Sequence, residues 1–420
     1  MEMTKYKLGD IATIYDGPHA TPKRTDNGPV YLGIDAITED CKINPNEFTF
    51  LSEEDYKIWT KRVVPQFKDI VFSYEATLGR YAIIPENFYG CLGRRLGIIR
   101  VKGDAVDYKW LYYFFQSPQW KCYIKNHIIK GSTVNRISVD EMPGYEIPAC
   151  GIADQKKIAS VLSALDDKIA LNKKMNQKLE AMAKRLYDYW FVQYDFPDKN
   201  GHPYKTTGGP MTYNPTLKRE IPVGWEVKTL DEYLDCNKYS LTAKSSYDFI
   251  QYLDTSSLTE NALESLQKYG SQAESPSRAK RIVYANDILY STVRPQQKHY
   301  GIIKNPAQNM IASTGFAILS CKYGSEYNDM FYLFLIQEKN LIKLSAIADS
   351  NASSYPSFNP SDLLNLSICL PEDIKTIEPL VKKFSSLFGI IERNQKENQK
   401  LTALRDKLLP LLMNGQVSVE

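Results

Sequence analysis

The feature that most constrains this chain is an internal repeat with a period of about 220 residues. Asp69-Ile-Val-Phe-Ser73 returns as Asp287-Ile-Leu-Tyr-Ser291, and Leu96-Gly-Ile-Ile-Arg-Val-Lys102 returns as Phe316-Ala-Ile-Leu-Ser-Cys-Lys322. Three further matches keep the same order: Arg80-Tyr-Ala-Ile-Ile84 with His299-Tyr-Gly-Ile-Ile303, Leu111-Tyr-Tyr-Phe-Phe115 with Phe331-Tyr-Leu-Phe-Leu335, and Asn176-Gln-Lys-Leu179 with Asn398-Gln-Lys-Leu401. This period is far longer than a solenoid repeat, so each copy is a whole domain with an appendage.

Inside each copy the apolar pattern changes once. Up to about residue 150 the first copy consists of short strand-like runs separated by turn formers, with one aromatic helix expected over about Tyr108–His127. After Pro148 the apolar residues recur at alternating steps of four and three, from Ile158 to Trp190, with Asp154 as the expected N-cap. That spacing is typical of a coiled-coil seam.

The second copy contains an equivalent helix, which is expected to start after Pro371 at Asp373. Its seam runs from Leu380 to Leu408 in the same frame. Both seams are interrupted by asparagines at equivalent places, namely Asn172, Asn176, Asn394 and Asn398. Polar residues in a seam cost stability and fix register. We therefore expect the two helices to pack against each other, and to run antiparallel because a whole domain separates them.

The predicted fold is α/β (α+β): two domains in pseudo-twofold repeat, each followed by a long helix, with the helices paired as an antiparallel coiled coil. A connector rich in turn formers joins the copies, and Phe196, Tyr204 and Tyr213 are expected to anchor it. The expected boundaries are 1–150 for the first domain, 151–193 for its helix, 194–222 for the connector, 223–371 for the second domain, and 372–420 for the second helix and tail.

The composition excludes several classes of function. The sequence has no G-x-x-x-x-G-K-[ST], G-x-G-x-x-G or H-E-x-x-H motif, and its four histidines are scattered. The seven cysteines are odd in number and lack C-x-x-C spacing, so they indicate reduced, mostly buried thiols rather than a metal or redox site. We therefore expect no catalysis, no metal and no cofactor bound by this chain.

The solubility class is equally constrained. No apolar run approaches the roughly 20 residues needed to span a membrane. The N-terminus passes directly into patterned sequence without a signal-peptide core, so we expect no membrane partner and a location in the cytoplasm. The formal net charge of +3 is only mildly basic and does not by itself indicate nucleic acid.

Two polar loops in each copy are candidates for DNA contact, because hydroxyl, amide and guanidinium groups bind phosphates and base edges. They are 74–80 and 130–138 in the first copy, and 292–298 and 351–359 in the second, and other basic residues of the first copy join them. The candidates in the first copy are Lys23, Arg24, Tyr74, Thr77, Arg80, Arg94, Arg95, Ser132, Thr133, Asn135 and Arg136. Those in the second copy are Ser291, Thr292, Arg294, Gln296, Gln297, Lys298, Ser353, Ser354, Tyr355 and Ser357. Any one of them alone would be ordinary surface polarity. As a set they differ completely between copies whose strands agree, which favours two readers of different sequences.

Over essentially its whole length the chain resembles the specificity subunit of type I restriction–modification systems. The resemblance rests on the Asp-Ile-x-x-Ser strands and on these further segments: Lys7-Leu-Gly-Asp-Ile-Ala12, Gly131-Ser-Thr133, Asp154-Gln-Lys-Lys-Ile158, the connector from Phe191 to Val227, and Lys407-Leu-Leu-Pro-Leu-Leu-Met-Asn-Gly-Gln416. One departure is visible, since the second copy has Ala352-Ser-Ser where the first has Gly131-Ser-Thr.

The resemblance implies two target-recognition domains, each reading one half of a bipartite, asymmetric site in double-stranded DNA. It also implies that the helices space the halves and dock two methyltransferase subunits, with restriction or motor subunits joining through the complex. S-adenosylmethionine, ATP and Mg²⁺ would then belong to the partners. An alternative remains: a non-catalytic coiled-coil adaptor that grips proteins through its two α/β domains. The mild net charge permits the adaptor, whereas the variable polar loops oppose it.

The first prediction concerns catalysis. Because the sequence carries no catalytic constellation, the purified chain should neither methylate nor cut DNA, with or without S-adenosylmethionine, ATP and magnesium. Methyl transfer and strand cleavage are the quantities to measure, and turnover by a demonstrably pure sample would show that the chain is an enzyme.

Overall fold

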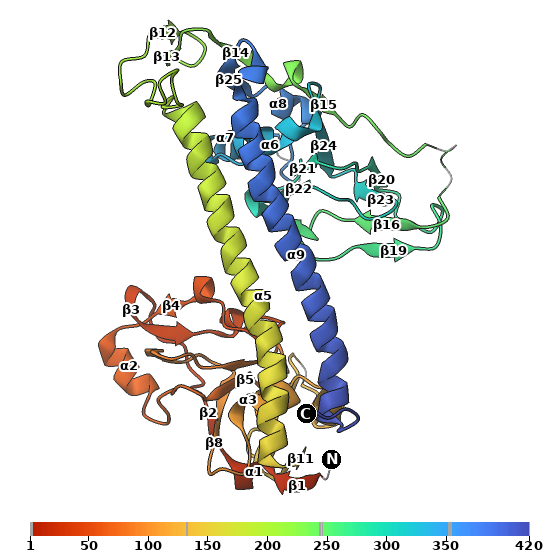
Figure 1. The fold of residues 1–420 in the computed structure, drawn as a ribbon. Helices are drawn as coiled ribbons and strands as arrows, with labels where there is room; N and C mark the ends of the chain where they lie inside the picture. Colours follow the sequence, from red (N-terminus) through yellow and green to blue (C-terminus); the bar gives the residue numbers. More distant parts are fainter. Residues whose placement is uncertain (1–2, 132, 243–244, 246, 352–354, 420) are drawn as a thin grey trace. The chain divides into compact units, whose positions relative to one another are not determined.

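The computed structural model describes residues 3–131, 133–242, 245, 247–351 and 355–419. The chain divides into two compact units, Met1–Ala170 with Asn398–Glu420, and Leu171–Glu397. Two long helices, α5 (Ile152–Tyr187) and α9 (Glu378–Met413), each contribute one part to either unit (Figure 1). Each unit therefore contains a sheet domain and a stretch of both helices.

The first unit is built on the antiparallel sheet β2-β8-β5-β6. Because side chains alternate along a strand, Ile70 and Phe72 of β5 pack against the aromatic helices, while Val71 packs on the other face. The expected strands at 70–73 and 96–101 are confirmed. The elements are β1 (Thr4–Lys7), α1 (Leu8–Ile11), β2 (Ala12–Asp16), β3 (Thr25–Leu32), β4 (Thr49–Phe50), α2 (Glu53–Trp59), β5 (Ile70–Ser73), β6 (Tyr81–Ile83), β7 (Gly90–Leu92), β8 (Leu96–Val101), α3 (Tyr108–Phe114), α4 (Pro118–Lys125), β9 (Ile128–Ile129), β10 (Arg136–Ile137) and β11 (Glu146–Ala149).

The single aromatic helix expected over 108–127 was wrong, because the structure divides it into α3 and α4. Pro118 has no backbone N–H to continue α3, and it occupies the first position of α4, where none is needed. The Ser117 hydroxyl caps the new helix by accepting from the backbone N–H of Trp120. The break lets Trp110 and Trp120 enter the same core.

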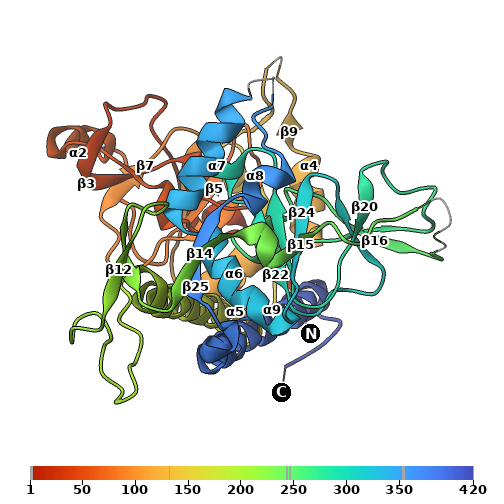
Figure 2. The same cartoon turned by 90° about the horizontal axis from the view of Figure 1, so that it is seen from above.

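The second unit repeats this framework with the sheet β15-β24-β21-β22. That sheet lies between α6 and a second sheet, β19-β16-β23-β20 (Figures 1 and 2). The elements are β12 (Met211–Asn214), β13 (Arg219–Pro222), β14 (Trp225–Thr229), β15 (Leu234–Cys236), β16 (Ile250–Leu253), β17 (Leu258–Thr259), β18 (Ala262–Leu263), β19 (Gln267–Tyr269), β20 (Ala279–Ile282), β21 (Asp287–Ser291), β22 (Tyr300–Ile303), β23 (Met310–Ser313), β24 (Phe316–Cys321), α6 (Asn328–Leu335), α7 (Glu338–Ser350), α8 (Pro360–Leu364) and β25 (Ser367–Pro371).

The ends of the long helices differ from expectation by a few residues. Helix α5 begins at Ile152, so Asp154 lies in the first turn rather than at the cap, where its charge still suits the helix dipole. Asp373 caps a 3₁₀ turn, Ile374–Ile377, and α9 starts only at Glu378. Trp190 belongs to a π-helical turn, Asp188–Val192, that follows α5.

Within each unit the two helices run antiparallel, as predicted. In the first unit Lys157 contacts the carbonyl of Val419, and Asp166 contacts Arg405. In the second unit the Asn172 amide donates to Glu397 at 2.8 Å. The predicted seam positions of α5 and α9 are all buried or half-buried, which confirms the spacing.

The seam asparagines form a polar contact inside the second unit. The Nδ2 of Asn394 donates to the Oδ1 of Asn176 at 2.8 Å, and the Nδ2 of Asn176 donates to the carbonyl of Ile391 at 3.3 Å. Asn176 is only 9% exposed, so its amide has little access to water. The matched asparagines therefore satisfy each other only in this register.

The connector is anchored by two of the three expected aromatic residues. The ring of Phe196 stacks on Tyr204 at 4.6 Å and on Trp225 at 4.9 Å between centroids. Tyr213 was expected to help, but this was wrong: its side chain is 64% exposed. It lies on β12 beside Met211, whose side chain packs on the small core beneath the hairpin.

The expected burial of most cysteines is confirmed. All seven cysteines are free thiols, five of them buried, while Cys236 is half-buried and Cys122 is exposed. Among the described residues, no helix combines the length and the apolar character that crossing a bilayer would require. In the same ranges, His, Cys, Asp and Glu side chains do not gather in a group suited to hold a metal ion.

The seam asparagines give the second prediction. Asn394→Leu alone should lower the free energy of unfolding by about 1–3 kcal/mol, because the buried Oδ1 of Asn176 loses its donor. The double change Asn176→Leu with Asn394→Leu should recover that loss but admit alternative helix pairings, visible as mixed oligomers. Thermal unfolding and light scattering after size exclusion measure both effects, with exposed Lys174→Ala as control. A single variant as stable as the control would contradict the argument.

Candidate nucleic-acid interface

In the first unit, two loops far apart in the sequence pair through their backbones. The loop after β5 and the segment around β10 meet where Glu75 and Arg136 form an isolated antiparallel bridge. The Ile137 N–H donates to the Tyr74 carbonyl at 2.8 Å, and the Ala76 N–H donates to the Asn135 carbonyl at 3.2 Å. We call residues 74–80 with residues 133–137 the first loop pair. The first loop pair brings together five candidates of the sequence analysis: Tyr74, Thr77, Thr133, Asn135 and Arg136.

The second unit contains the same arrangement in the same register. Val293 and Ser357 form the equivalent isolated bridge. The Phe358 N–H donates to the Thr292 carbonyl at 3.0 Å, and the Arg294 N–H donates to the Pro356 carbonyl at 2.9 Å. Residues 292–298 with residues 355–358 are the second loop pair. Each hydrogen bond of the first loop pair thus has a counterpart here, although the side chains differ.

A third segment joins each loop pair: the turn between β7 and β8 in the first unit and the turn between β23 and β24 in the second. The Tyr74 N–H donates to the Arg95 carbonyl at 3.2 Å, and the Thr292 N–H donates to the Gly315 carbonyl at 2.9 Å. Arg95 adopts a left-handed conformation, φ 72°, at the position equivalent to that glycine. Its Nε donates to Glu75 at 3.0 Å, which ties the turn to the loop pair. Arg94, next to it, is exposed.

The serine that ends each Asp-Ile-x-x-Ser strand is buried and shapes the loop that follows. Ser73 donates to the Thr77 carbonyl and accepts from the Arg80 N–H at 3.2 Å. Ser291, a predicted candidate, donates to the Val293 carbonyl at 2.8 Å and is 2% exposed. Its hydroxyl therefore lies beneath the second loop pair and not on its surface.

The aspartate that opens the same motif also has one role in both copies. Asp69 accepts from the Gln66 N–H at 2.8 Å, and Asp287 accepts from the Tyr284 N–H at 2.7 Å. Each carboxylate closes the turn that leads into its strand. The repeated motif is thus a device that fixes the start and the end of the strand carrying a candidate loop.

Other candidates of the first copy lie in different settings. Lys23 and Arg24 are exposed, in the segment that leads into β3, and the hydrogen bonds of the first loop pair do not include them. The Arg80 guanidinium donates to the Ile37 carbonyl at 2.9 Å and pairs with Glu39. Arg80 thus supports a neighbouring loop. Ser132 lies outside the described residues.

Gly131, from the Gly-Ser-Thr match, occupies a place that only glycine fits. A Cβ atom there would lie 2.2 Å from the carbonyl oxygen of Val134. The backbone of this turn approaches itself too closely for a side chain. The corresponding Ala352 of the second copy lies outside the described residues, as do the candidates Ser353 and Ser354.

The second loop pair presents long polar side chains to solvent. Arg294, Gln296, Gln297 and Lys298 are all exposed. The guanidinium of Arg294 lies 5.2 Å from the centre of the Tyr355 ring, an aromatic residue that is itself 62% exposed. Lys298 pairs with Glu260 at 2.9 Å. Such groups hydrogen-bond to base edges and phosphates, so this surface has the chemistry of a nucleic-acid contact.

Two candidates of the second loop pair are less exposed than these side chains. The hydroxyl of Thr292 is largely buried and donates to the Gly315 carbonyl at 3.1 Å. Ser357 is half-buried, and its carbonyl accepts from the Asn351 side chain at 3.2 Å. Both residues hold the loops together.

The sequence did not single out a cluster beside the first loop pair. Asp16, at the end of β2, lies 2.8 Å from the ring of His19 and 3.7 Å from Arg62. Tyr74 is 5% exposed, and its hydroxyl faces this carboxylate. Burial first, and then Asp16, raise the pKa of Tyr74 above its ordinary value. A signal existed, because Lys61-Arg62 recurs as Lys280-Arg281.

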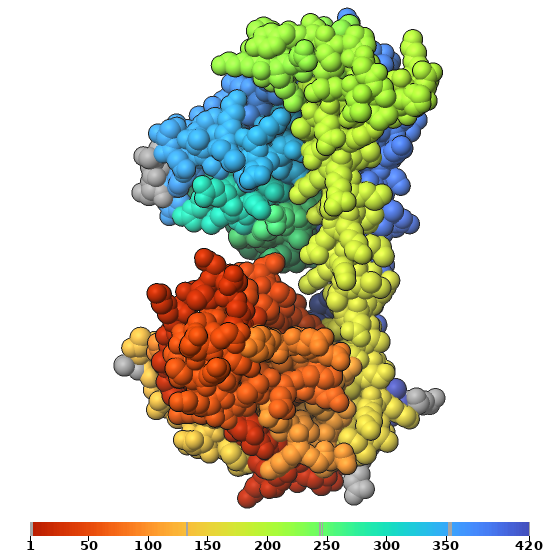
Figure 3. Space-filling view, turned by 90° about the vertical axis from the view of Figure 1, so that its left-hand side faces the viewer, coloured from red at the N-terminus to blue at the C-terminus, as the bar shows by residue number. Residues whose placement is uncertain are grey.

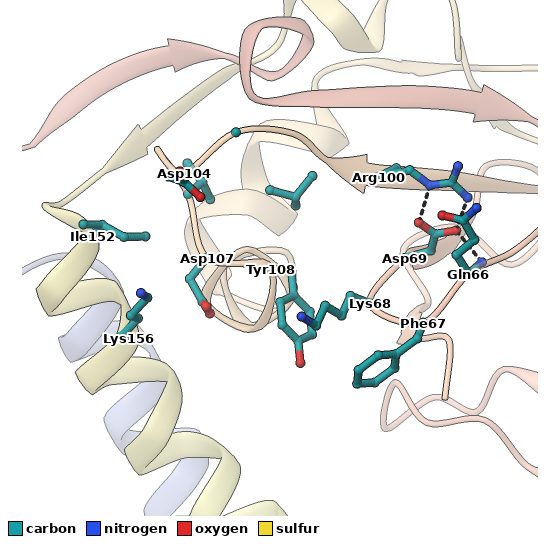
Figure 4. A pocket seen from close by; sticks show the side chains of 13 residues that line it. Gln66, Phe67, Lys68, Asp69, Arg100, Asp104, Asp107, Tyr108, Ile152 and Lys156 are labelled. Atoms are coloured by element: carbon teal, nitrogen blue, oxygen red, sulfur yellow. Dashed lines mark hydrogen bonds and ion pairs between the residues drawn. The ribbon is translucent and has the colours of Figure 1, made fainter. Parts of the chain in front are cut away.

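A cavity of about 560 Å³ opens elsewhere in the first unit, and Figure 4 shows its lining. The Arg100 guanidinium there pairs with Asp69 at 2.7 Å. Asp107 is occupied as well, since it caps α3 by accepting from the Trp110 N–H at 3.0 Å. Asp69 and Asp107, two of the carboxylates that line this cavity, thus serve the fold.

Comparison with known proteins follows the same division into two copies. The family model described as "Type I restriction modification DNA specificity domain" matches residues 1–181 and 222–403, well over half of the chain. Each matched range contains one of the two loop pairs.

Individual relatives that match this chain also carry the name of type I restriction enzyme specificity subunits. The chain is 27% identical over 380 residues to a "Type I restriction enzyme MjaIX specificity subunit" of Methanocaldococcus jannaschii, covering 88% of this chain and 82% of that protein. It is 22% identical over 386 residues to the MjaVIII specificity subunit of the same organism, covering 87% and 82%. Among solved structures, a type I restriction–modification S subunit from M. genitalium matches with TM-score 0.56 and 16% identity, covering 98% of this chain and 96% of that one. This last likeness concerns the fold.

Proposed function

We propose, from the premise that this chain belongs to the type I restriction modification DNA specificity domain family, that each loop pair reads one half of a bipartite DNA target. The chain provides DNA sequence specificity within a restriction–modification complex and leaves catalysis to its partners. The observation that carries the proposal is the repeated backbone pairing with different side chains. A constant frame with variable polar side chains suits two readers of unlike sequences.

A second surface supports a proposal about the subunits that bind this chain. Helix α5 exposes an apolar stripe in the second unit, made of Leu171 (54% exposed), Met175 (40%) and Met182 (55%). These residues are spaced to share one helix face, and a face of α5 lies open at the surface (Figure 3). An exposed apolar stripe favours a protein partner. We assign it to a methyltransferase subunit, one of two that would bring S-adenosylmethionine, with ATP and Mg²⁺ on the restriction subunits.

The adaptor alternative makes a different prediction about the loop pairs. A protein–protein interface needs large apolar contacts near its centre. Arg294, Gln296 and Gln297 instead present polar groups, which favours DNA. Methylation mapping of DNA from cells that carry this chain and its methyltransferase decides the question: a bipartite methylated motif supports the reader, and its absence supports the adaptor.

The third prediction separates the two readers. Replacing Arg294, Gln296 and Gln297 by alanine removes exposed side chains but keeps Ser291 and Thr292, which hold the loop. Methylation mapping should show one half-site changed or lost and the bases of the other half unchanged. The exposed Lys382→Ala, on α9, serves as the control and should leave both halves as they are. A change in both halves together would refute the division of labour.

The fourth prediction tests whether the helices set the spacing of the half-sites. The boundary between the units falls after Ala170 in α5 and after Glu397 in α9. One heptad inserted at each point keeps both seams in phase and lengthens the helical segment by about 10 Å. The unspecified gap should then grow by about three base pairs, at 3.4 Å each, while both half-site sequences stay.

The matched control for this experiment carries the same heptad after Gly208, in the connector, where it lengthens no helix. Methylation mapping reads out both variants. An unchanged gap with retained methylation in the double insertion would mean that some other contact sets the spacing.

A further inference from the structure

A basic pair recurs ahead of the Asp-Ile-x-x-Ser strand in both copies. Lys61-Arg62-Val-Val becomes Lys280-Arg281-Ile-Val, at nearly the same offset as the strand motif. The residues of the loop pairs differ completely between the copies, whereas this arginine stays. A side chain kept in two domains that read different sequences serves either the fold or a contact that both DNA halves share, and the exposed side chain of Arg62 favours the contact.

In the first unit Arg62 lies beside the first loop pair. Its Nη1 is 3.7 Å from the Asp16 carboxylate, which also lies 2.8 Å from the ring of His19. The side chains of Arg62 and His19 are each 65% exposed, whereas Asp16 is 29% exposed. Tyr74, at the root of the first loop pair, faces the same carboxylate. Asp16 therefore places two solvent-facing nitrogen groups next to the candidate interface.

In the second unit Arg281 lies in the segment that corresponds to Arg62 in the sequence, ahead of β21, and it is half-buried. It lies on β20 opposite Ser240, and its Nη1 donates to the Ser240 hydroxyl at 3.0 Å. Its charge also acts on the thiol of Cys236, at the end of β15. Burial raises the pKa of that thiol to about 11, and Arg281 opposes the rise.

The segment of Arg281 is also tied to the second loop pair. The Thr314 N–H donates to the Arg278 carbonyl at 2.8 Å, and the next residue, Gly315, accepts from the Thr292 N–H. Arg281 follows Arg278 after two intervening residues. The backbone thus leads directly from the loop pair to the arginine.

We propose that Arg62 and Arg281 are a matched pair of DNA-backbone contacts, one beside each loop pair, and that Asp16 and Ser240 are the positioning residues that aim them. Phosphate is the group that every half-site offers regardless of its bases, and a guanidinium binds it through charge-assisted hydrogen bonds. The proposal rests on the DNA-reading function proposed above. It adds a sequence-independent contact to sequence-dependent loops.

The experiment measures DNA affinity against salt for the chain in complex with its methyltransferase. Each phosphate contact contributes about 0.9 to the slope of log K against log salt. Arg62→Gln and Arg281→Gln should each flatten the slope by about that amount, and the double variant by about twice as much. The methylated motif should stay the same, because no base contact is removed. Arg185→Ala, an exposed arginine of α5, is the control and should leave the slope unchanged.

Ser240 has its own test. Ser240→Ala removes the hydroxyl that holds Arg281 but leaves the charge, so affinity should fall several-fold. Ser240→Thr restores the hydroxyl and should restore affinity, which a purely structural role at this position would not require. Thermal unfolding of every variant shows whether the fold is intact.

The outcomes separate the two proposals. A wild-type complex without sequence-specific binding overturns the proposed function. A wild-type complex that binds its motif, with slopes of the Arg62 and Arg281 variants equal to that of the Arg185 control, overturns this inference alone. Slopes that fall only in variants that are also unfolded overturn it too, since the arginines would then serve the fold.

Discussion

The backbone pairing between two distant loops is the constraint on which the rest of the candidate interface depends. In each unit three consecutive residues of one loop meet three of the other, at Glu75–Arg136 and at Val293–Ser357. Because main-chain N–H and C=O groups make these bonds, the frame imposes little on the side chains that it carries. Loops can therefore change their chemistry without loss of shape, which a protein that reads sequence requires.

The long helices meet a different requirement, which is a single register. In the second unit the Asn176–Asn394 contact fixes this register, and in the first unit a charged group, Asp166, does so. Burial pushes the pKa of Asp166 up, but Lys42, Arg405 and Tyr113 together bring it below its ordinary value. A depressed folded-state pKa contributes stability that is present at neutral pH and is lost as the pH falls. Both devices satisfy buried polar groups only when the helices align correctly.

Sequence periodicity predicted the features that arise from local spacing and failed where distant residues decide. The seam from Ile158 to Trp190 follows from its spacing of four and three residues, and the strands at 70–73 and 96–101 follow from short apolar runs between turn formers. Both predictions were confirmed. The split between α3 and α4 was missed although Ser117-Pro118 was visible, because the aromatic stripe masked it. The pairing of the loops was out of reach, since nothing local in residues 74–80 points to residues 133–137. Ser291 is a residue type that often contacts DNA, and only its burial in the structure shows that it shapes the loop instead.

A reader of variable sequences has to obtain affinity and specificity from separate groups. If the variable side chains also supplied the electrostatic binding energy, each change of target would change the affinity as well. Arginines that persist in both copies remove this coupling, because the phosphate backbone is the same at every site. Arg62 and Arg281 stand beside the loop pairs on strands or segments that the variable loops do not include. The repeat thus divides the work between a constant contact that binds and a variable one that selects.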